Sequence, residues 1–427
     1  TPPGRGGIGV VRVSGAVVPE LAIALLGKLP EPRYATFSAF RDARGEAIDT
    51  GIALYFPAPN SFTGEDVLEL QGHGSPVVMD MLVERLCELG ARPAEPGEFS
   101  QRAFLNDKLD LAQAEAIADL IDSASRTAAR AANRSLQGRF SELVLDLNAE
   151  VTALRVYVEA AIDFPEEEID FLSDSALQQR LQDVRGRFTA IEATVKQGRL
   201  LRDGVTIVLA GRPNAGKSSL LNALAGYDAA IVTDIAGTTR DLVREQIELD
   251  GLPVHIIDTA GLRESGDAVE EEGIRRARQE LVNADHALLI IDSSDAGDAA
   301  EGMLAAELPA GLGYTVVRNK ADLSGESPGQ VSDNTLVISA ATGAGIDALR
   351  APLQQQVGYE PAAEGSVTAR QRHLESLQRA RGYFDSACRV LEEQQAGELM
   401  AEELLQVQNA LAEITGQFSS DDLLGEI

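Results

Sequence analysis

The sequence has few cysteines and no long apolar run. Its two cysteines, Cys87 and Cys388, lie far apart and lack the spacing of metal ligands, which argues against a cysteine-based metal site and is typical of a reducing cytoplasm. Neither a signal peptide nor an apolar stretch of membrane length is present, and we therefore expect a cytoplasmic protein with no membrane partner. The chain begins Thr1-Pro-Pro without a methionine, so we expect a few residues to precede it.

Basic residues are also scarce. The chain has 37 Lys and Arg against 67 Asp and Glu, which gives a net charge of −30. Because each contact with a nucleic-acid phosphate needs Lys or Arg, this balance argues against a broad nucleic-acid surface. If RNA is a partner, we expect another protein to supply much of the positive surface.

Residues 211–219 carry the clearest motif. Gly211-Arg-Pro-Asn-Ala-Gly-Lys-Ser-Ser219 fits the phosphate-loop pattern of Gly, four residues, Gly, Lys, and Ser or Thr. The apolar run 205–210 predicts a buried strand before it, and 220–225 predicts a helix after it. In that context, loop N–H groups and the helix N-terminus surround phosphate oxygens. Lys217 is predicted to reach the terminal phosphates, and the Ser218 hydroxyl to bind Mg²⁺.

The whole chain has 427 residues, too many for one hydrophobic core. Outside the phosphate loop, it divides into segments with different hydrophobic patterns. The N-terminal part mixes strand patterns at 9–14, 51–56 and 67–70, the last ended by Gly72-His-Gly74, with a helix pattern at 77–89. Residues 111–160 repeat apolar positions at helical spacing, which predicts one or two long helices in a bundle. Residues 176–200 and 366–415 continue this texture on either side of the stretch around the phosphate loop.

This alternation predicts a multidomain α+β and α/β fold, with the α/β domain inserted into a helical domain. The predicted domains are 1–118 (α+β), 119–203 (first helical part), 204–358 (α/β) and 359–427 (second helical part). Within the first helical part, Arg126, Arg130 and Arg134 fall four residues apart and hence on one helix face. A solvated face is the ordinary interpretation, and a basic docking stripe is the alternative.

Four further motifs identify the nucleotide. Asp258-Thr-Ala-Gly261 follows an apolar strand, where a carboxylate near Mg²⁺ and a glycine N–H on the γ-phosphate are needed. Gly237-Thr-Thr-Arg-Asp241 lies in a loop that can order over Mg²⁺. Asn319-Lys-Ala-Asp322 offers a carboxylate to guanine N1–H and the 2-amino group, neither of which adenine has. Ser339-Ala-Ala341 can place a backbone N–H on guanine O6. Together with the phosphate loop, these motifs predict a Ras-like GTP-binding domain.

One position departs from Ras-like switches. The residue after Gly261 is Leu262, where those proteins have a glutamine that orients the attacking water. Two residues are candidates for the missing role: Asn214 could coordinate a monovalent cation beside the β- and γ-phosphates, and Glu270 could act on the water. Both assignments stay open on the residues alone, because Asn is a common turn residue and a run of Glu also suits a solvated helix start.

The chain closely resembles the MnmE (TrmE) family of bacterial tRNA-modification GTPases along essentially its whole length. Outside the nucleotide motifs, the matching runs are 1–7, 60–74, 96–99, 102–115, 159–164 and 421–425. Such long runs are specific to this family rather than to GTPases at large. The resemblance implies an N-terminal domain, of folate-binding type, that dimerises and binds a 5-formyl- or methylene-tetrahydrofolate through Arg12, Glu69 and Lys108.

The resemblance also implies K⁺ binding in the G domain, with dimerisation of two G domains across the nucleotides and faster hydrolysis. The implied K⁺ ligands are Asn214, Thr233, the carbonyl of Ile235, and Thr238. Mg²⁺ falls to Ser218 and Thr239, and the catalytic residues are Glu270, Lys217 and Gly261. The expected GTP-binding residues are Asn214, Ala215, Gly216, Lys217, Ser218, Ser219, Thr233, Asp234, Ile235, Ala236, Gly237, Thr238, Thr239, Asp258, Thr259, Ala260, Gly261, Asn319, Lys320, Ala321, Asp322, Ser339, Ala340 and Ala341.

The family works with MnmG, which binds FAD and uses NADH. The pair adds an aminomethyl or carboxymethylaminomethyl group to C5 of the wobble uridine in certain tRNAs. We therefore expect a homodimer in a hetero-oligomer with MnmG, and tRNA held largely through that partner. The family ends in a Cys-Ile-Gly-Lys tail, whereas this chain stops at Ile427, so no catalytic thiol is assigned. Cys87 and Cys388 are expected to be packing residues.

Two other functions share some of these features. A ribosome-assembly or signalling GTPase carries the same five motifs, and binding of a reduced folate discriminates between it and the tRNA-modification function. A helical scaffold with a degenerate nucleotide domain is the third possibility. The intact Lys217, Ser218, Thr239 and Asp258 argue against it.

Overall fold

The computed structural model describes residues 4–163, 175–227, 244–258, 284–295, 298–306, 308–360, 365–394 and 396–416. The chain forms two compact units, Thr1–Glu115 and Ala116–Ile427. The boundary falls within helix α4 (Leu111–Ile121). None of the described helices combines the length and the apolar character that a membrane crossing requires.

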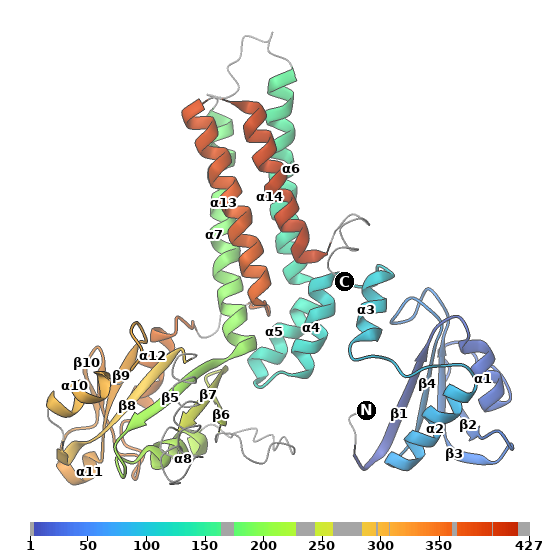
Figure 1. The fold of residues 1–427 in the computed structure, drawn as a ribbon, viewed down its shortest axis with the longest axis horizontal. Helices are drawn as coiled ribbons and strands as arrows, with labels where there is room; N and C mark the ends of the chain where they lie inside the picture. Colours follow the sequence, from blue (N-terminus) through green and yellow to red (C-terminus); the bar gives the residue numbers. More distant parts are fainter. Residues whose placement is uncertain are drawn as a thin grey trace, which may run out of the picture. The chain divides into compact units, whose positions relative to one another are not determined.

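The first unit is built on a four-stranded antiparallel sheet in the order β1-β4-β3-β2. Its strands are β1 (Gly6–Ser14), β2 (Thr36–Arg41), β3 (Ala47–Phe56) and β4 (Val67–Gly74). Helices α1 (Val18–Leu26) and α2 (Pro76–Glu88) share one buried core with the sheet, and α3 (Glu98–Leu105) follows (Figure 1). The predicted strands and helix are confirmed, but the expected end of the third strand is wrong. β4 continues through Gly72-His-Gly74 because these residues pair with β1.

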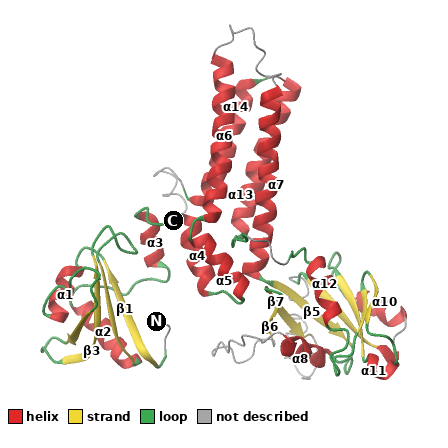
Figure 2. Ribbon diagram, turned by 180° about the vertical axis from the view of Figure 1, so that it is seen from behind, coloured by secondary structure: helices red, strands yellow, loops and turns green. Residues whose placement is uncertain are grey.

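The helical part of the second unit is a bundle of long helices. α6 (Arg139–Asp163), α7 (Ser175–Asp203), α13 (Gln371–Gln394) and α14 (Gly397–Thr415) run side by side (Figures 1 and 2). Apolar residues at helical spacing bury one stripe of each helix, as the sequence predicts. In α6 this stripe includes Phe140, Leu147 and Leu154, each at most 1% exposed.

The prediction of one or two helices over 111–160 is wrong, because the structure has three. After α4, the chain breaks and restarts as α5 (Arg126–Leu136), then turns at Gly138 into α6. Ser125 is the N-cap residue of α5, and its hydroxyl accepts a hydrogen bond from the N–H of Ala128 over 3.0 Å. Gly138 has φ 89°, a left-handed conformation that favours glycine. An Ala-rich periodic pattern continues across both breaks and so conceals them.

The inserted α/β domain has a seven-stranded sheet in the order β10-β11-β9-β8-β5-β7-β6. The five inner strands are parallel, and the edge strands β10 and β6 are antiparallel. The strands are β5 (Val205–Gly211), β6 (Arg244–Leu249), β7 (Leu252–Asp258), β8 (His286–Asp292), β9 (Tyr314–Asn319), β10 (Gly329–Ser332) and β11 (Thr335–Val337). The described helices are α8 (Lys217–Tyr227), α10 (Asp298–Ala306), α11 (Ala321–Ser324) and α12 (Asp347–Gln356), with a 3₁₀ turn at Ser293–Asp295.

The α/β domain and the bundle share a core and a set of buried polar contacts. Ala131 of α5 and Leu201 of α7 belong to the same apolar cluster as the strands of the inserted sheet. The Ser125 hydroxyl donates a hydrogen bond to the carbonyl of Gly251, in the turn between β6 and β7, over 2.7 Å. Asp119, only 5% exposed at its side chain, accepts hydrogen bonds from Arg202 and Arg370, which lie at the two chain crossings between the domains.

The arginines of α5 and the two cysteines differ in their burial. Arg126 and Arg130 are exposed, as expected of a solvated face, but Arg134 is half-buried and donates to the carbonyl of Ser366 over 3.0 Å. Cys388 of α13 is buried in the bundle, as predicted for a packing residue. Cys87 is half-buried on α2 and lines a cavity of the first unit.

Candidate functional site

The phosphate loop connects β5 to α8, as the sequence predicts. Asn214 and Gly216 have positive φ angles of 63° and 93°, so the loop turns sharply before the helix begins at Lys217. The side chain of Lys217 is nearly buried, and its ammonium group donates to the carbonyls of Gly211 and Arg212, each over 2.9 Å. Ser218 and Ser219 are exposed on the first turn of α8. The loop thus holds a lysine, hydroxyls and a helix N-terminus together, the combination that suits phosphate groups.

Asn319 joins the phosphate loop to the loops predicted to recognise guanine. Its side-chain amide donates to the carbonyl of Ala215 over 3.0 Å, and its side-chain oxygen accepts from the N–H of Ala340 over 2.9 Å. Asn319 is 2% exposed, so both hydrogen bonds are shielded from water. A Cβ added at Gly216 would lie 2.1 Å from the Asn319 amide nitrogen, so this position requires glycine.

The predicted guanine-binding segments also contact each other directly. The Ser339 hydroxyl donates to one carboxylate oxygen of Asp322 over 2.6 Å. Asp322 is exposed, and Ala321 and Ser339 beside it are buried. Ala341 is exposed at the end of its segment. The structure therefore brings together three of the predicted elements: the phosphate loop, 319–322 and 339–341.

Asp292 is a site residue that the sequence reasoning missed. Its carboxylate accepts from the Lys320 ammonium over 2.6 Å and from both the N–H and the hydroxyl of Ser294. These hydrogen bonds, that of Lys320 first, lower the pKa of Asp292 to about 2. Lys320 itself has a positive φ of 68°, so the backbone around it is constrained. An Asp at the end of the apolar run 287–291 was the available signal, because motif residues of this domain follow such strands.

Several predicted residues cannot be placed with this group. Asp258 is the last residue of β7, and its backbone pairs in register with Leu209 of β5. The remaining ones lie outside the described residues: Thr233, Asp234, Ile235, Ala236, Gly237, Thr238, Thr239, Thr259, Ala260, Gly261 and Glu270. Asn214 lies beside a cavity of about 180 Å³ that Asp292 and Leu304 also line. The assignments of Mg²⁺, K⁺ and catalytic residues therefore stay predictions.

The second candidate site is in the first unit. Arg12 of β1 and Glu69 of β4 are register partners, and their side chains form an ion pair at 2.6 Å. The Arg12 guanidinium also lies over the rings of Phe62 and Phe99, at 5.7 and 5.8 Å from their centroids. Lys108 is exposed, and among the described residues no ion pair or hydrogen bond joins its side chain to Arg12 or Glu69. The structure thus brings two of the three predicted folate residues together.

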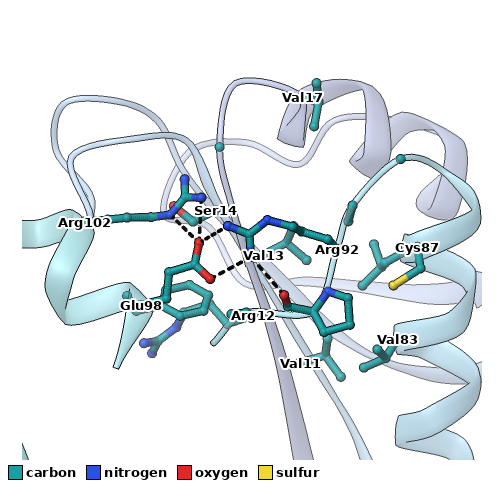
Figure 3. Close-up of a pocket in the computed structure, with 17 residues that line it drawn as sticks. Val11, Arg12, Val13, Ser14, Val17, Val83, Cys87, Arg92, Glu98 and Arg102 are labelled. Atoms are coloured by element: carbon teal, nitrogen blue, oxygen red, sulfur yellow. Dashed lines mark hydrogen bonds and ion pairs between the residues drawn. The ribbon is translucent and has the colours of Figure 1, made fainter. Parts of the chain in front are cut away.

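A cavity of about 440 Å³ follows the free edge of β1 and includes Arg12 and Phe99 in its lining. Figure 3 shows the Glu98 carboxylate of α3 between the guanidinium groups of Arg92 and Arg102. Hydrogen bonds from Arg92, and then from the N–H of Glu95 and from Arg102, lower the pKa of Glu98 to about 2. The cavity wall therefore carries an anion held between cations. Glu98 and Arg102 lie in the family-matching runs 96–99 and 102–115, but the sequence alone predicts no role for them.

The loop beneath this wall is held by Glu65. Arg102 donates to both oxygens of the Glu65 carboxylate, over 3.1 and 2.9 Å. The Ser14 hydroxyl donates to Glu65 over 2.8 Å and contacts the buried hydroxyl of Thr63 at 2.6 Å. These contacts fix part of the 60–74 run that matches the MnmE family, next to the strand that carries Arg12.

Comparisons with known proteins place the two units in one family. A family model described as the N-terminus of the GTP-binding protein TrmE matches residues 1–108. A second model, of the MnmE helical domain, matches residues 111–427, the greater part of the chain.

Among solved structures, the chain is similar to an Era variant from Aquifex aeolicus bound to GDP.AlF4-. The two share 26% identity, over 42% of this chain and 66% of that chain, just under two thirds of its length, with a TM-score of 0.28. It is also similar to the G domain of the T. maritima FeoB iron transporter, at 23% identity over 36% of this chain and 98% of that chain, with a TM-score of 0.27.

Proposed function

The chain belongs to the MnmE (TrmE) family of GTP-binding proteins, and on this premise we propose that it is a K⁺-activated GTP hydrolase that modifies tRNA. With the FAD-binding partner MnmG, it adds an aminomethyl or carboxymethylaminomethyl group to C5 of the wobble uridine of certain tRNAs. The observation that carries the GTPase part is the pair of hydrogen bonds made by the Asn319 side chain, which donates to Ala215 and accepts from Ala340 and so connects the phosphate loop to the proposed guanine-binding segments.

Nucleotide selection follows from Asp322. A carboxylate accepts two hydrogen bonds from guanine and none from adenine, so ATP would leave the carboxylate without these partners. Lys217 and the N–H groups of the loop bind the phosphates, and the Lys320 side chain, held by Asp292, stays beside the base-binding segment. These contacts support GTP as the substrate.

Hydrolysis in this proposal uses a cation in place of an arginine finger. K⁺, held by Asn214, Thr233, the Ile235 carbonyl and Thr238, supplies positive charge at the phosphates when it is bound. Ser218 and Thr239 would hold Mg²⁺, Glu270 would act on the attacking water, and the Gly261 N–H would donate to the γ-phosphate. Two G domains dimerise across their nucleotides. The exposure of Asn214 supports its part, because its side chain is accessible to a cation from solvent.

The first unit is proposed to bind a reduced folate, 5-formyl- or methylene-tetrahydrofolate, which donates a one-carbon unit when bound. The chemistry of the residues fits such a ligand. Arg12 suits the glutamate carboxylates, and among the described residues only one oxygen of Glu69 is engaged, by Arg12, so the other suits the donors of a pterin ring. Lys108 adds a second cation. The protein is proposed to be a cytoplasmic homodimer. Its partner MnmG would bind FAD and use NADH.

We also propose that GTP hydrolysis drives a conformational change in the bundle. The turn between β6 and β7 joins the strand that ends at Asp258 to the helical domain, through Ser125 and Tyr359. A change at Asp258 therefore has a continuous, buried route to α5. Crosslinking the two G domains in their apposed state is expected to stop modification turnover. Unchanged turnover would contradict this coupling.

Reconstitution tests the function as a whole. The chain, MnmG, unmodified tRNA, GTP, NADH, a reduced folate and an amine that supplies the nitrogen (ammonium or glycine) are combined with Mg²⁺ and K⁺, and modified uridine is measured by mass spectrometry. We expect modification that requires every component and is lost in Glu69→Gln, together with folate binding. Glu46→Gln, an exposed carboxylate of the same unit, is the matched control. GTP hydrolysis without folate binding and without uridine modification would favour a ribosome-assembly or signalling GTPase.

A further inference from the structure

A cavity of about 950 Å³ lies where the bundle meets the α/β domain, away from the nucleotide site. Its walls come from the end of α5, the start of α6, the second half of α7, and the chain on either side of 361–364. No motif of the sequence points to it, and the proposed reaction does not use it.

The cavity concentrates positive charge. Arg134, Arg139, Lys196 and Arg199 line it, and among the described lining residues Glu360 is the one acidic side chain. The whole chain has a net charge of −30, with more acidic than basic residues. In the cavity lining, the basic residues are the more numerous. Such a local reversal focuses anions toward the cavity.

Within the part of the chain that the structure describes, these cations make few hydrogen bonds. Arg134 gives one N–H to the carbonyl of Ser366, and Arg199 gives one to the side-chain oxygen of Gln371. Arg139 pairs with Glu142 on the exposed surface of α6. Lys196 has no ion-pair partner within the described ranges. A guanidinium has five N–H donors, so each arginine keeps several for a ligand.

The cavity wall is held firmly in place. The Ser135 hydroxyl bridges the carbonyl and the N–H of Thr368, over 3.1 and 2.9 Å. At Gly198 of α7, an added Cβ would lie 2.3 Å from the carbonyl of Val367, so helix and chain touch backbone to backbone. Gln197 donates to the carbonyl of Gly358 and accepts from the N–H of Glu360. These contacts fix the backbone segments that carry the cations before a ligand arrives, which lowers the entropic cost of binding.

We propose that this cavity binds phosphate groups, from the backbone of an RNA or from a free polyphosphate. Arginine forks match the geometry of phosphate oxygens, and several cations from separate segments suit a ligand with several charges. None of the described lining residues is aromatic, so these residues offer charge but no stacking surface for bases. Recognition is therefore of phosphate and not of sequence. The RNA alternative rests on the proposed function, whereas the polyphosphate alternative does not.

Binding of two probes tests this site. The full chain is first saturated with GDP and Mg²⁺ so that the phosphate loop is occupied. Unmodified tRNA and inorganic tripolyphosphate are then titrated separately, by fluorescence anisotropy and by calorimetry, over a range of salt concentrations. The test variant is Arg139→Gln with Lys196→Gln, both exposed side chains. The control is Lys28→Gln with Arg389→Gln, which are also exposed and remove the same charge elsewhere.

If the cavity binds an RNA backbone, the test variant weakens tRNA binding by about tenfold or more at low salt and reduces the log–log salt slope by about 2, for two lost phosphate contacts. The control variant keeps the wild-type affinity and slope. If it binds a free polyphosphate, only tripolyphosphate shows the selective loss. Absence of binding by both probes, or equal losses in test and control variants, would overturn the proposal. Unchanged GTP hydrolysis and melting of both variants show that they are folded, independently of the binding result.

Discussion

Asn319 donates a hydrogen bond from its side-chain amide to the carbonyl of Ala215, over 3.0 Å, and so connects two loops that are more than a hundred residues apart. The same side chain accepts from Ala340. One buried amide therefore holds the phosphate loop and the segment 339–341, which we propose to bind the phosphates and the base, at a fixed separation.

We expect Asn319→Ala to weaken GDP and GTP binding by about tenfold or more. The substitution removes both hydrogen bonds and leaves the N–H of Ala340 without this partner, a loss of about 1–3 kcal/mol for a buried polar group, and each 1.4 kcal/mol is about tenfold in affinity. Calorimetric titration with GDP measures the effect. Asn334→Ala, at an exposed asparagine of the same domain, is the control. Wild-type affinity in Asn319→Ala would show that the loops hold their positions without this amide.

Asp322→Asn is expected to change the base preference from guanine to xanthine. An amide in place of the carboxylate loses the acceptor for one guanine donor and gains an N–H that matches the 2-carbonyl of xanthine. Competition between GTP and XTP for the variant measures the preference. We expect GTP affinity to fall by about a hundredfold or more, with XTP binding more tightly than GTP. Retention of GTP preference would mean that Asp322 does not contact the base.

Ser125→Ala is expected to loosen the contact between the bundle and the α/β domain. The Ser125 hydroxyl caps the N-terminus of α5 and donates to the buried carbonyl of Gly251. Its loss is therefore expected to lower the free energy of unfolding by about 1–3 kcal/mol. We expect the midpoint of urea unfolding to fall. Circular dichroism or tyrosine fluorescence measures it, since the chain has no tryptophan. Thr189→Ala, which removes an ordinary hydroxyl on the exposed side of α7, should leave it nearly unchanged. Equal midpoints for the two variants would contradict a special role of Ser125.

The two cysteines are expected to differ in reactivity. Burial raises the pKa of Cys388 to about 11, so at pH 8 roughly one molecule in a thousand carries the reactive thiolate. A thiol reagent at pH 8 should modify Cys87 and spare Cys388 in the folded protein. In Cys87→Ser, reaction should begin only on unfolding, or as the pH rises toward the pKa of Cys388. Rapid labelling of the folded Cys87→Ser variant would show that α13 opens in solution.

The sequence predicts the strands before the proposed nucleotide loops well, because an apolar run that ends in a motif is typical of a buried strand. β5 and β7 lie where the run 205–210 and the apolar residues before Asp258 place them. The link between Asn319 and Ala215 is a different matter, because it depends on the order of the strands in the sheet, which a single sequence does not reveal. The same holds for Asp292, which reaches Lys320 because β8 and β9 pair in parallel with Asp292 opposite Asn319.

In the helical domain, the sequence predicts the helices but not the breaks between them. Local periodicity predicts helix throughout 111–160, and the breaks near Ser125 and Gly138 are set by contacts with the α/β domain and by a left-handed glycine. In the first unit, Arg12 and Glu69 are far apart in the sequence and become neighbours only through the register of β1 and β4. The cations of the large cavity likewise come from separate segments that the fold assembles.

The most direct test of the proposed GTPase is hydrolysis by the purified chain in KCl and in NaCl at equal ionic strength, with Asn214→Ala alongside and Asn334→Ala as control. A cation that replaces an arginine finger stabilises the transition state, and losing such a group typically costs on the order of 10²-fold or more. We predict a large preference for K⁺ in the wild type and the control, and none in Asn214→Ala. Equal rates in both salts would contradict the account and would mean that another group neutralises the phosphates.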